Sequence, residues 1–72
     1  MDTQVFPTKT LVRDVEASIK RGFITRPALA VNLHAASNKE AYQCVVEAVK
    51  VLLDEHRITQ VNVNGYMCFF PA

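Results

Sequence analysis

The chain has few of the residues on which many functional sites depend. Its 72 residues include no tryptophan, two glycines and two cysteines. The lone glycines at positions 22 and 65 exclude a glycine-rich phosphate-binding loop, and no nucleophile stands at a spacing that would pair it with a base. Cys44 and Cys68 lie too far apart in sequence for a C-x-x-C motif and no histidine cluster accompanies them, so we expect buried thiols. The sequence therefore predicts a protein that is not an enzyme and holds no cofactor and no metal.

The sequence also lacks a long apolar run and a surplus of charge. No hydrophobic stretch approaches the roughly 18 residues of a membrane span, and residues 1–10 lack the charged-then-apolar pattern of a secretion signal, so we expect a cytoplasmic protein without a membrane contact. The formal net charge of +1 is too small for whole-molecule attraction to nucleic acid. Half of the residues are hydrophobic, which is a globular composition. We expect one domain, residues 8–72, after a tail or short edge strand at residues 1–7.

The clearest helix signal begins at Ser37. The run from Ser37 to Glu40 reads S-N-K-E, a capping box in which the serine hydroxyl accepts from the Glu40 amide. Apolar residues then recur with helical spacing, and neither Gly nor Pro interrupts them. They are Ala41, Val45, Ala48, Val49, Leu52 and Leu53. The pattern predicts a central helix over residues 38–56, with Ser37 as its cap and with two neighbouring elements packed against it.

Two β-prone runs flank the dipeptide Asn64-Gly65, which is typical of a type I′ hairpin turn. Closing the hairpin there pairs Val63 with Tyr66 and Gln60 with Phe69. Because side chains alternate along a strand, each face receives every second residue. The residues that we expect to face the core are Val61, Val63, Tyr66, Cys68 and Phe70. The residues that we expect on the outer face are Gln60, Asn62, Met67 and Phe69.

An earlier helix is indicated over residues 10–21. Its cap is Thr8 or Thr10, and Gly22 supplies the left-handed residue that ends a helix. The apolar stripe that predicts it consists of Leu11, Val12, Val15 and Ile19.

Residues 26–36 allow two interpretations. Thr25 as a cap and Pro27 in the first turn indicate a short helix. The alternation of Leu29, Val31 and Leu33 is instead typical of a strand. Four of these eleven residues are alanine, which is favourable in helices and poor in strands, so the helix is favoured.

With the helix, the predicted fold is mainly α with a C-terminal β-hairpin, in the order α-α-α-β-β. The run ITRPALAVNLHAASNKEAY, and LLDEHRI followed by the Asn-Gly hairpin, resemble a winged helix-turn-helix DNA-binding domain over residues 10–70. His56 stands where such domains have glycine between helix and wing. The resemblance implies a small DNA-binding transcriptional regulator, or a phage or plasmid accessory protein, that acts as a dimer. The alternative is an α+β interaction module or inhibitor, with residues 28–34 as a strand beside the hairpin.

The charge pattern bears on the same question, because no acidic residue occurs between Ala17 and Lys39. The cations of this stretch are Lys20, Arg21, Arg26 and Lys39. In a winged helix they lie at the turn between the first two helices and at the start of the third, where helix dipoles favour phosphates. The residues then expected to read duplex DNA in the major groove are Asn38, Lys39, Tyr42 and Gln43. The competing interpretation is that these cations are ordinary solvated surface.

Met67 and Phe69 on the expected outer face form an apolar patch without a partner in the chain. We expect this patch to be a homodimer interface or, in the alternative fold, the contact with another protein, because a chain of this length has a thin burial margin. The competing prediction is that residues 3–6 cover the patch as a third strand.

Overall fold

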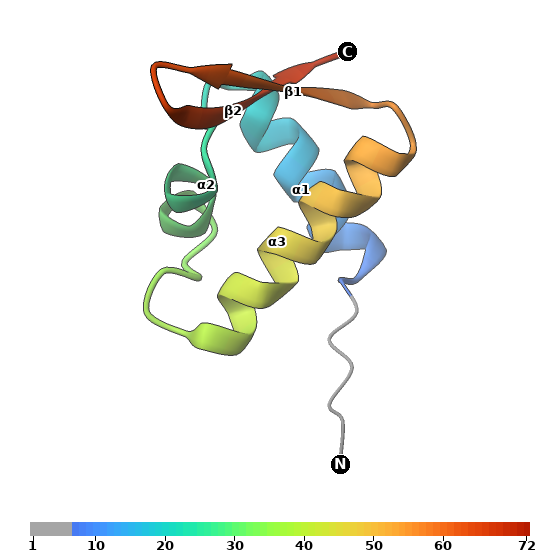
Figure 1. The fold of residues 1–72 in the computed structure, drawn as a ribbon. Helices are drawn as coiled ribbons and strands as arrows, with labels where there is room; N and C mark the ends of the chain where they lie inside the picture. Colours follow the sequence, from blue (N-terminus) through green and yellow to red (C-terminus); the bar gives the residue numbers. More distant parts are fainter. Residues whose placement is uncertain (1–6) are drawn as a thin grey trace.

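The computed structural model describes residues 7–72 and shows three helices followed by one antiparallel hairpin (Figure 1). The elements are α1 Lys9–Lys20, α2 Arg26–Asn32, α3 Lys39–Asp54, β1 Ile58–Val63 and β2 Tyr66–Pro71. The predicted α-α-α-β-β order is confirmed, with the long helix shorter at both ends than residues 38–56. Because residues 26–32 are helical, the alternative strand at residues 28–34 is wrong. The tail prediction and the third strand at residues 3–6 lie outside the described residues.

Each helix begins at a side-chain cap. The Thr8 hydroxyl accepts from the Leu11 amide at 3.1 Å, and the Thr25 hydroxyl accepts from the Ala28 amide at 3.3 Å. α3 is capped by Asn38, whose Oδ1 accepts from the Ala41 amide at 3.0 Å, so the prediction that Ser37 caps this helix was wrong. An asparagine caps a helix about as well as a serine, so the helix can begin one residue later than the S-x-x-E pattern indicates.

The three helices also end alike, in Schellman motifs. After α1 the Phe23 amide donates to the Ser18 carbonyl at 3.0 Å, and Gly22 takes the predicted left-handed conformation with φ 107°. The corresponding residues after α2 and α3 are His34 with φ 58° and His56 with φ 57°. His56 therefore adopts the backbone conformation of the glycine whose place it takes in the winged-helix pattern.

The core lies where the inward faces of α1, α2 and α3 meet the hairpin. It is formed by Val15, Ile19, Leu29, Ala30, Ala35, Val45, Ala48, Val49, Leu52, Ile58 and Phe69. α3 packs against α1, α2 and β1, which confirms the prediction of a central helix with more than one neighbour. One buried polar contact joins the first two helices, because the Asn32 side-chain amide donates to the Ser18 hydroxyl at 2.7 Å.

The hairpin has the predicted register and turn. Val63 pairs with Tyr66 and Gln60 with Phe69. Asn64 and Gly65 have φ of 52° and 85°, the positive values that a type I′ turn requires at both central positions. The Asn62 side chain supports the turn by accepting from the Gly65 amide at 3.0 Å.

The face of the hairpin that packs on the helices is nevertheless the opposite of the predicted one. Phe69 is 0% exposed, so its assignment to the outer face was wrong. Among the residues expected in the core only Cys68 is buried. The others are exposed: Val61 by 44%, Val63 by 41%, Tyr66 by 70% and Phe70 by 37%.

The reason for this reversal is the first residue of β1. Ile58 follows α3 closely and is buried, at 3% exposure. Since side chains alternate along the strand, a buried Ile58 places Gln60 on the helix side of the sheet, where Gln60 stays exposed, and pairing then places Phe69 on the same side, where it is buried. Counting apolar residues on the two faces of the hairpin predicted that the opposite face would pack on the helices. The connection to α3 instead determines which face does so.

The capping geometry predicts unequal effects of two neighbouring substitutions. Asn38→Ala removes the acceptor for the Ala41 amide and should lower the free energy of unfolding by about 1 kcal/mol. Ser37→Ala, outside the helix, should change it by less than about 0.5 kcal/mol. Urea unfolding followed by far-ultraviolet circular dichroism measures both, and the reverse order of effects would restore Ser37 as the cap.

The burial of Phe69 predicts a similar contrast in the hairpin. Phe69→Ala should destabilise the protein by about 3–5 kcal/mol, which is enough to unfold a small domain, whereas Phe70→Ala should cost about 1 kcal/mol or less. Phe69→Leu should remain folded with an intermediate loss, so that the comparison holds even where the alanine variant is unfolded. Equal losses at positions 69 and 70 in urea denaturation would show that the assigned face is wrong.

Candidate nucleic-acid interface

A hollow of about 490 Å³ opens between the start of α2, the first turn of α3 and the hairpin. We call it the wing hollow. It is lined by Thr25, Arg26, Pro27, Tyr42, Tyr66 and Met67. Arg26 and Tyr42, two predicted DNA contacts from separate helices, thus face the same space. The sequence analysis missed the hairpin residues of this wall, since it placed Tyr66 in the core and Met67 in a dimer interface.

The start of α3 presents polar side chains beside the wing hollow. Asn38, Lys39 and Gln43 are exposed and Tyr42 is half-buried. The side-chain oxygen of Asn38 is engaged in the cap, which leaves its amide nitrogen as the group that can donate to a ligand. The polar side chains of this helix that lie beside the wing hollow therefore belong to its first turn and a half.

Acidic charge accompanies these donors along α3, because Glu40 is exposed in the first turn and Glu47 lies one turn beyond Gln43. The Gln43 side-chain amide donates to Oε1 of Glu47 at 3.0 Å, and Lys50 Nζ lies 3.2 Å from the same oxygen. This carboxylate restrains Gln43 and neutralises Lys50. Of the predicted reading residues, Gln43 is thus the one that must exchange an existing hydrogen bond to contact a base.

Lys20 and Arg21 lie away from the start of α3. Both are exposed at the end of α1, which reaches the hairpin, whereas α3 begins at the opposite end of the molecule (Figure 1). The Arg21 guanidinium carbon lies 5.9 Å from the centre of the Phe23 ring, within the range of a cation–π contact. The structure therefore brings Arg26 and Tyr42 together and leaves Lys39 at the other end of the molecule from Lys20 and Arg21.

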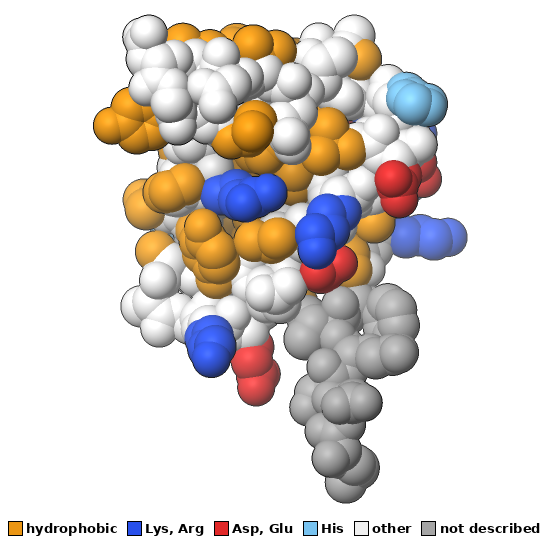
Figure 2. All heavy atoms as spheres, in the orientation of Figure 1, with side chains coloured by type: hydrophobic (Ala, Val, Ile, Leu, Met, Phe, Trp, Pro, Cys, Tyr) orange, Lys and Arg blue, Asp and Glu red, His pale blue; other side chains and the backbone are white. Residues whose placement is uncertain are grey.

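Basic side chains do not form one continuous patch on the face shown in Figure 2. Blue side chains are separated from one another there, and they stand next to red acidic side chains or among hydrophobic ones. A surface of this kind provides individual cationic contacts rather than a broad positive field.

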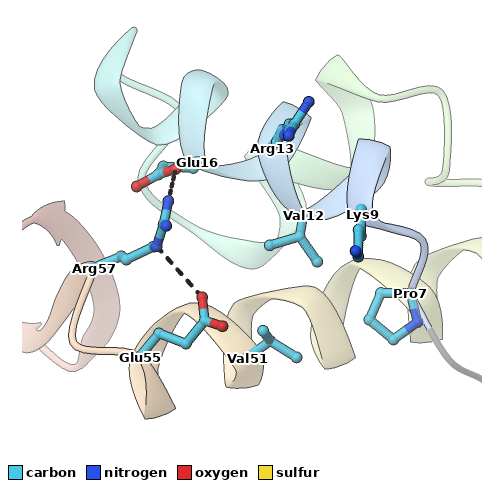
Figure 3. A pocket seen from close by; sticks show the side chains of 8 residues that line it. All are labelled: Pro7, Lys9, Val12, Arg13, Glu16, Val51, Glu55 and Arg57. Atoms are coloured by element: carbon cyan, nitrogen blue, oxygen red, sulfur yellow. Dashed lines mark hydrogen bonds and ion pairs between the residues drawn. The ribbon is translucent and has the colours of Figure 1, made fainter.

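A second hollow, of about 410 Å³, lies between α1 and the C-terminal half of α3 (Figure 3). Val12 and Val51 form apolar parts of its wall, and charged side chains surround them. Arg57 spans one end, with Nη1 3.2 Å from Glu16 Oε1 and Nε 3.4 Å from Glu55 Oε1. Exposed ion pairs of this kind contribute little stability. The residues that line this hollow include no Ser, Thr, Cys or His.

The remaining candidates for chemistry are the cysteines and the acidic residues. Cys68 is a buried free thiol, as expected, and Cys44 is a free thiol that is only half-buried. Within residues 7–72, no three His, Cys, Asp or Glu side chains lie together as metal ligands would. In the same part of the chain, none of the helices is both long enough and apolar enough to cross a membrane.

Comparisons of the chain with protein-family models, with curated proteins and with solved structures gave no match. The layout of three helices and a C-terminal antiparallel hairpin is compatible with a winged helix.

Proposed function

We propose that the protein is a small DNA-binding regulator, of the kind found as transcription factors or as phage or plasmid accessory proteins, and not an enzyme. The first turn of α3 enters the major groove of duplex DNA, and the wing hollow lies over the adjacent phosphates. The observation that carries the proposal is the meeting of Arg26 and Tyr42 in a hollow whose opposite wall is the hairpin. A helix and a hairpin on two sides of one hollow offer a duplex two separate contacts.

Arg26 supports the phosphate contact. It is the first residue of α2 and is exposed at the mouth of the hollow. A guanidinium group can donate two parallel hydrogen bonds to one phosphate, which lysine cannot do. The Tyr42 and Tyr66 hydroxyls on the same hollow are further donors of the type that contacts phosphate oxygens. These groups position a duplex without reading its sequence.

The base contacts in this proposal come from Asn38, Lys39 and Gln43. An α-helix fits the major groove, where a lysine pairs with guanine and a carboxamide pairs with adenine. Lys39 is available as a reader because it is the exposed first residue of α3. The Gln43 side-chain amide already donates to Glu47, so Gln43 contributes only where a base competes with Glu47 for this hydrogen bond.

The small net charge of +1 sets the expected character of binding. Each phosphate contact releases counterions and adds roughly one unit to the slope of log affinity against log salt. With the few cations near the wing hollow, we expect weak binding to arbitrary duplexes and a shallow salt dependence. Tight binding then requires the correct base sequence.

The experiment is a fluorescence anisotropy titration of a labelled random-sequence duplex at several salt concentrations. Arg26→Ala, which removes a phosphate contact, should weaken binding several-fold and reduce the salt slope by about one unit. Lys39→Ala removes a base contact and should weaken binding to a random-sequence duplex less than Arg26→Ala does. Arg13→Ala is the matched control, because Arg13 is an exposed cation that lines the other hollow. It removes the same charge and should leave most of the affinity intact.

Two results would contradict this proposal. No binding by the parent protein at low salt would remove duplex DNA as the ligand. An equal loss for Arg13→Ala and Arg26→Ala would show that attraction is general and that the wing hollow is not the contact.

A further inference from the structure

The outward face of the hairpin carries a contiguous set of exposed apolar side chains. Val61, Val63, Tyr66 and Phe70 are 44%, 41%, 70% and 37% exposed. They belong to one face because Val63 pairs directly with Tyr66, Val61 stands two residues before Val63, and Phe70 stands four residues after Tyr66, with the buried Cys68 between them on the same face. We call these residues the outward apolar face. Contiguous apolar surface on a small domain is typical of an interaction site.

This face differs from the one that the sequence predicted for self-association. Phe69 is fully buried and cannot contact a second molecule. Met67 is on the same side of the sheet as Phe69 and lines the wing hollow. The outward apolar face lies on the other side of the sheet from Phe69, and its Tyr66 also reaches the wing hollow at the edge of the hairpin.

Charge is absent from the whole hairpin. The segment from Ile58 to the last residue contains no Lys, Arg, Asp, Glu or His. Over the hairpin, at the top of Figure 2, the side chains are accordingly hydrophobic or uncharged. All eight Lys and Arg and all seven Asp and Glu residues precede Ile58.

The lack of charge bears on what covers the outward apolar face. In a two-fold symmetric dimer each side chain near the axis faces its own copy, so any charge there meets a like charge. A face without charge avoids this repulsion. A different protein partner is usually selected by charge complementarity, and this face offers no charged group for that purpose.

We propose that the outward apolar face packs against the same face of a second copy of this chain, in a two-fold symmetric dimer. The two hairpins stack as facing sheets, about 10 Å apart, as in sheet-on-sheet packing. Each copy contributes apolar surface on the order of a few hundred Å², less than the roughly 800 Å² per partner of a standard interface. The dimer is therefore weak and dissociates on dilution. It does not rest on the proposed DNA binding, because Val61, Val63 and Phe70 do not line the wing hollow; of the outward apolar face only Tyr66 belongs to both surfaces.

The test is sedimentation equilibrium of the parent protein and of three variants over a range of concentrations. Val61→Lys places a charge in the centre of the face and should give a monomer at concentrations where the parent is dimeric. Val61→Thr keeps a β-branched side chain and should raise the dissociation constant several-fold without affecting the fold. The matched control is Val31→Lys, because Val31 is an apolar residue on α2 that is 65% exposed and lies outside the hairpin.

The proposal is supported by a parent dimer that is retained in Val31→Lys and weakened in both Val61 variants, with circular dichroism unchanged. It is overturned by a parent that stays monomeric at several hundred micromolar. It is also overturned when Val61→Thr dimerises as tightly as the parent, or when Val31→Lys loses the dimer to the same extent as Val61→Lys.

Discussion

The burial of Phe69 is the contact on which the position of the hairpin depends. A two-stranded hairpin is marginal by itself, so it must be held by packing on another element. Here the Phe69 side chain joins the helical core, and its backbone amide donates to the Ile24 carbonyl at 2.7 Å. The ring and the backbone of one residue thus attach β2 both to the core and to the connection between α1 and α2. Met67, two residues earlier on the same side, is placed by this attachment as part of the wall opposite Arg26.

The junction between α3 and β1 is the second constraint, since it decides which face of the hairpin turns inward. The chain reverses over three residues, with His56 in the left-handed conformation and the Arg57 amide donating to the Leu52 carbonyl at 2.9 Å. A non-glycine residue in this conformation costs on the order of 1 kcal/mol or more. The Schellman hydrogen bonds and the burial of Ile58 directly after the junction offset that cost. Glu16 and Glu55 hold the Arg57 side chain over the same junction.

The sequence predicts the local features of this fold better than the way in which they combine. The Asn64-Gly65 turn is a short-range signal, and it correctly set the hairpin pairing. The inward face depends on Ile58, which stands outside the alternating run that starts at Gln60, so the periodicity of the run alone led to the wrong face. In the candidate site, Arg26 and Tyr42 followed from the winged-helix resemblance. The contribution of Met67 and Tyr66 to the same hollow did not, because it depends on how the hairpin lies over the helices.

The separation of charge from the hairpin limits what each part of the molecule can contribute to binding. Every charged side chain belongs to the chain before Ile58, so attraction to an anionic ligand comes from the helices and their connections. In the two proposals, the hairpin contributes shape, hydrogen bonds and apolar contacts, through the wing hollow in one and through the outward apolar face in the other. Neighbouring residues of a strand point to opposite sides of the sheet. A substitution at Met67 therefore leaves the side of Cys68 unaltered, and a substitution at Val61 leaves the side of Gln60 unaltered. The two surfaces share one hairpin and the Tyr66 side chain, and substitutions at Met67 and at Val61 alter them separately.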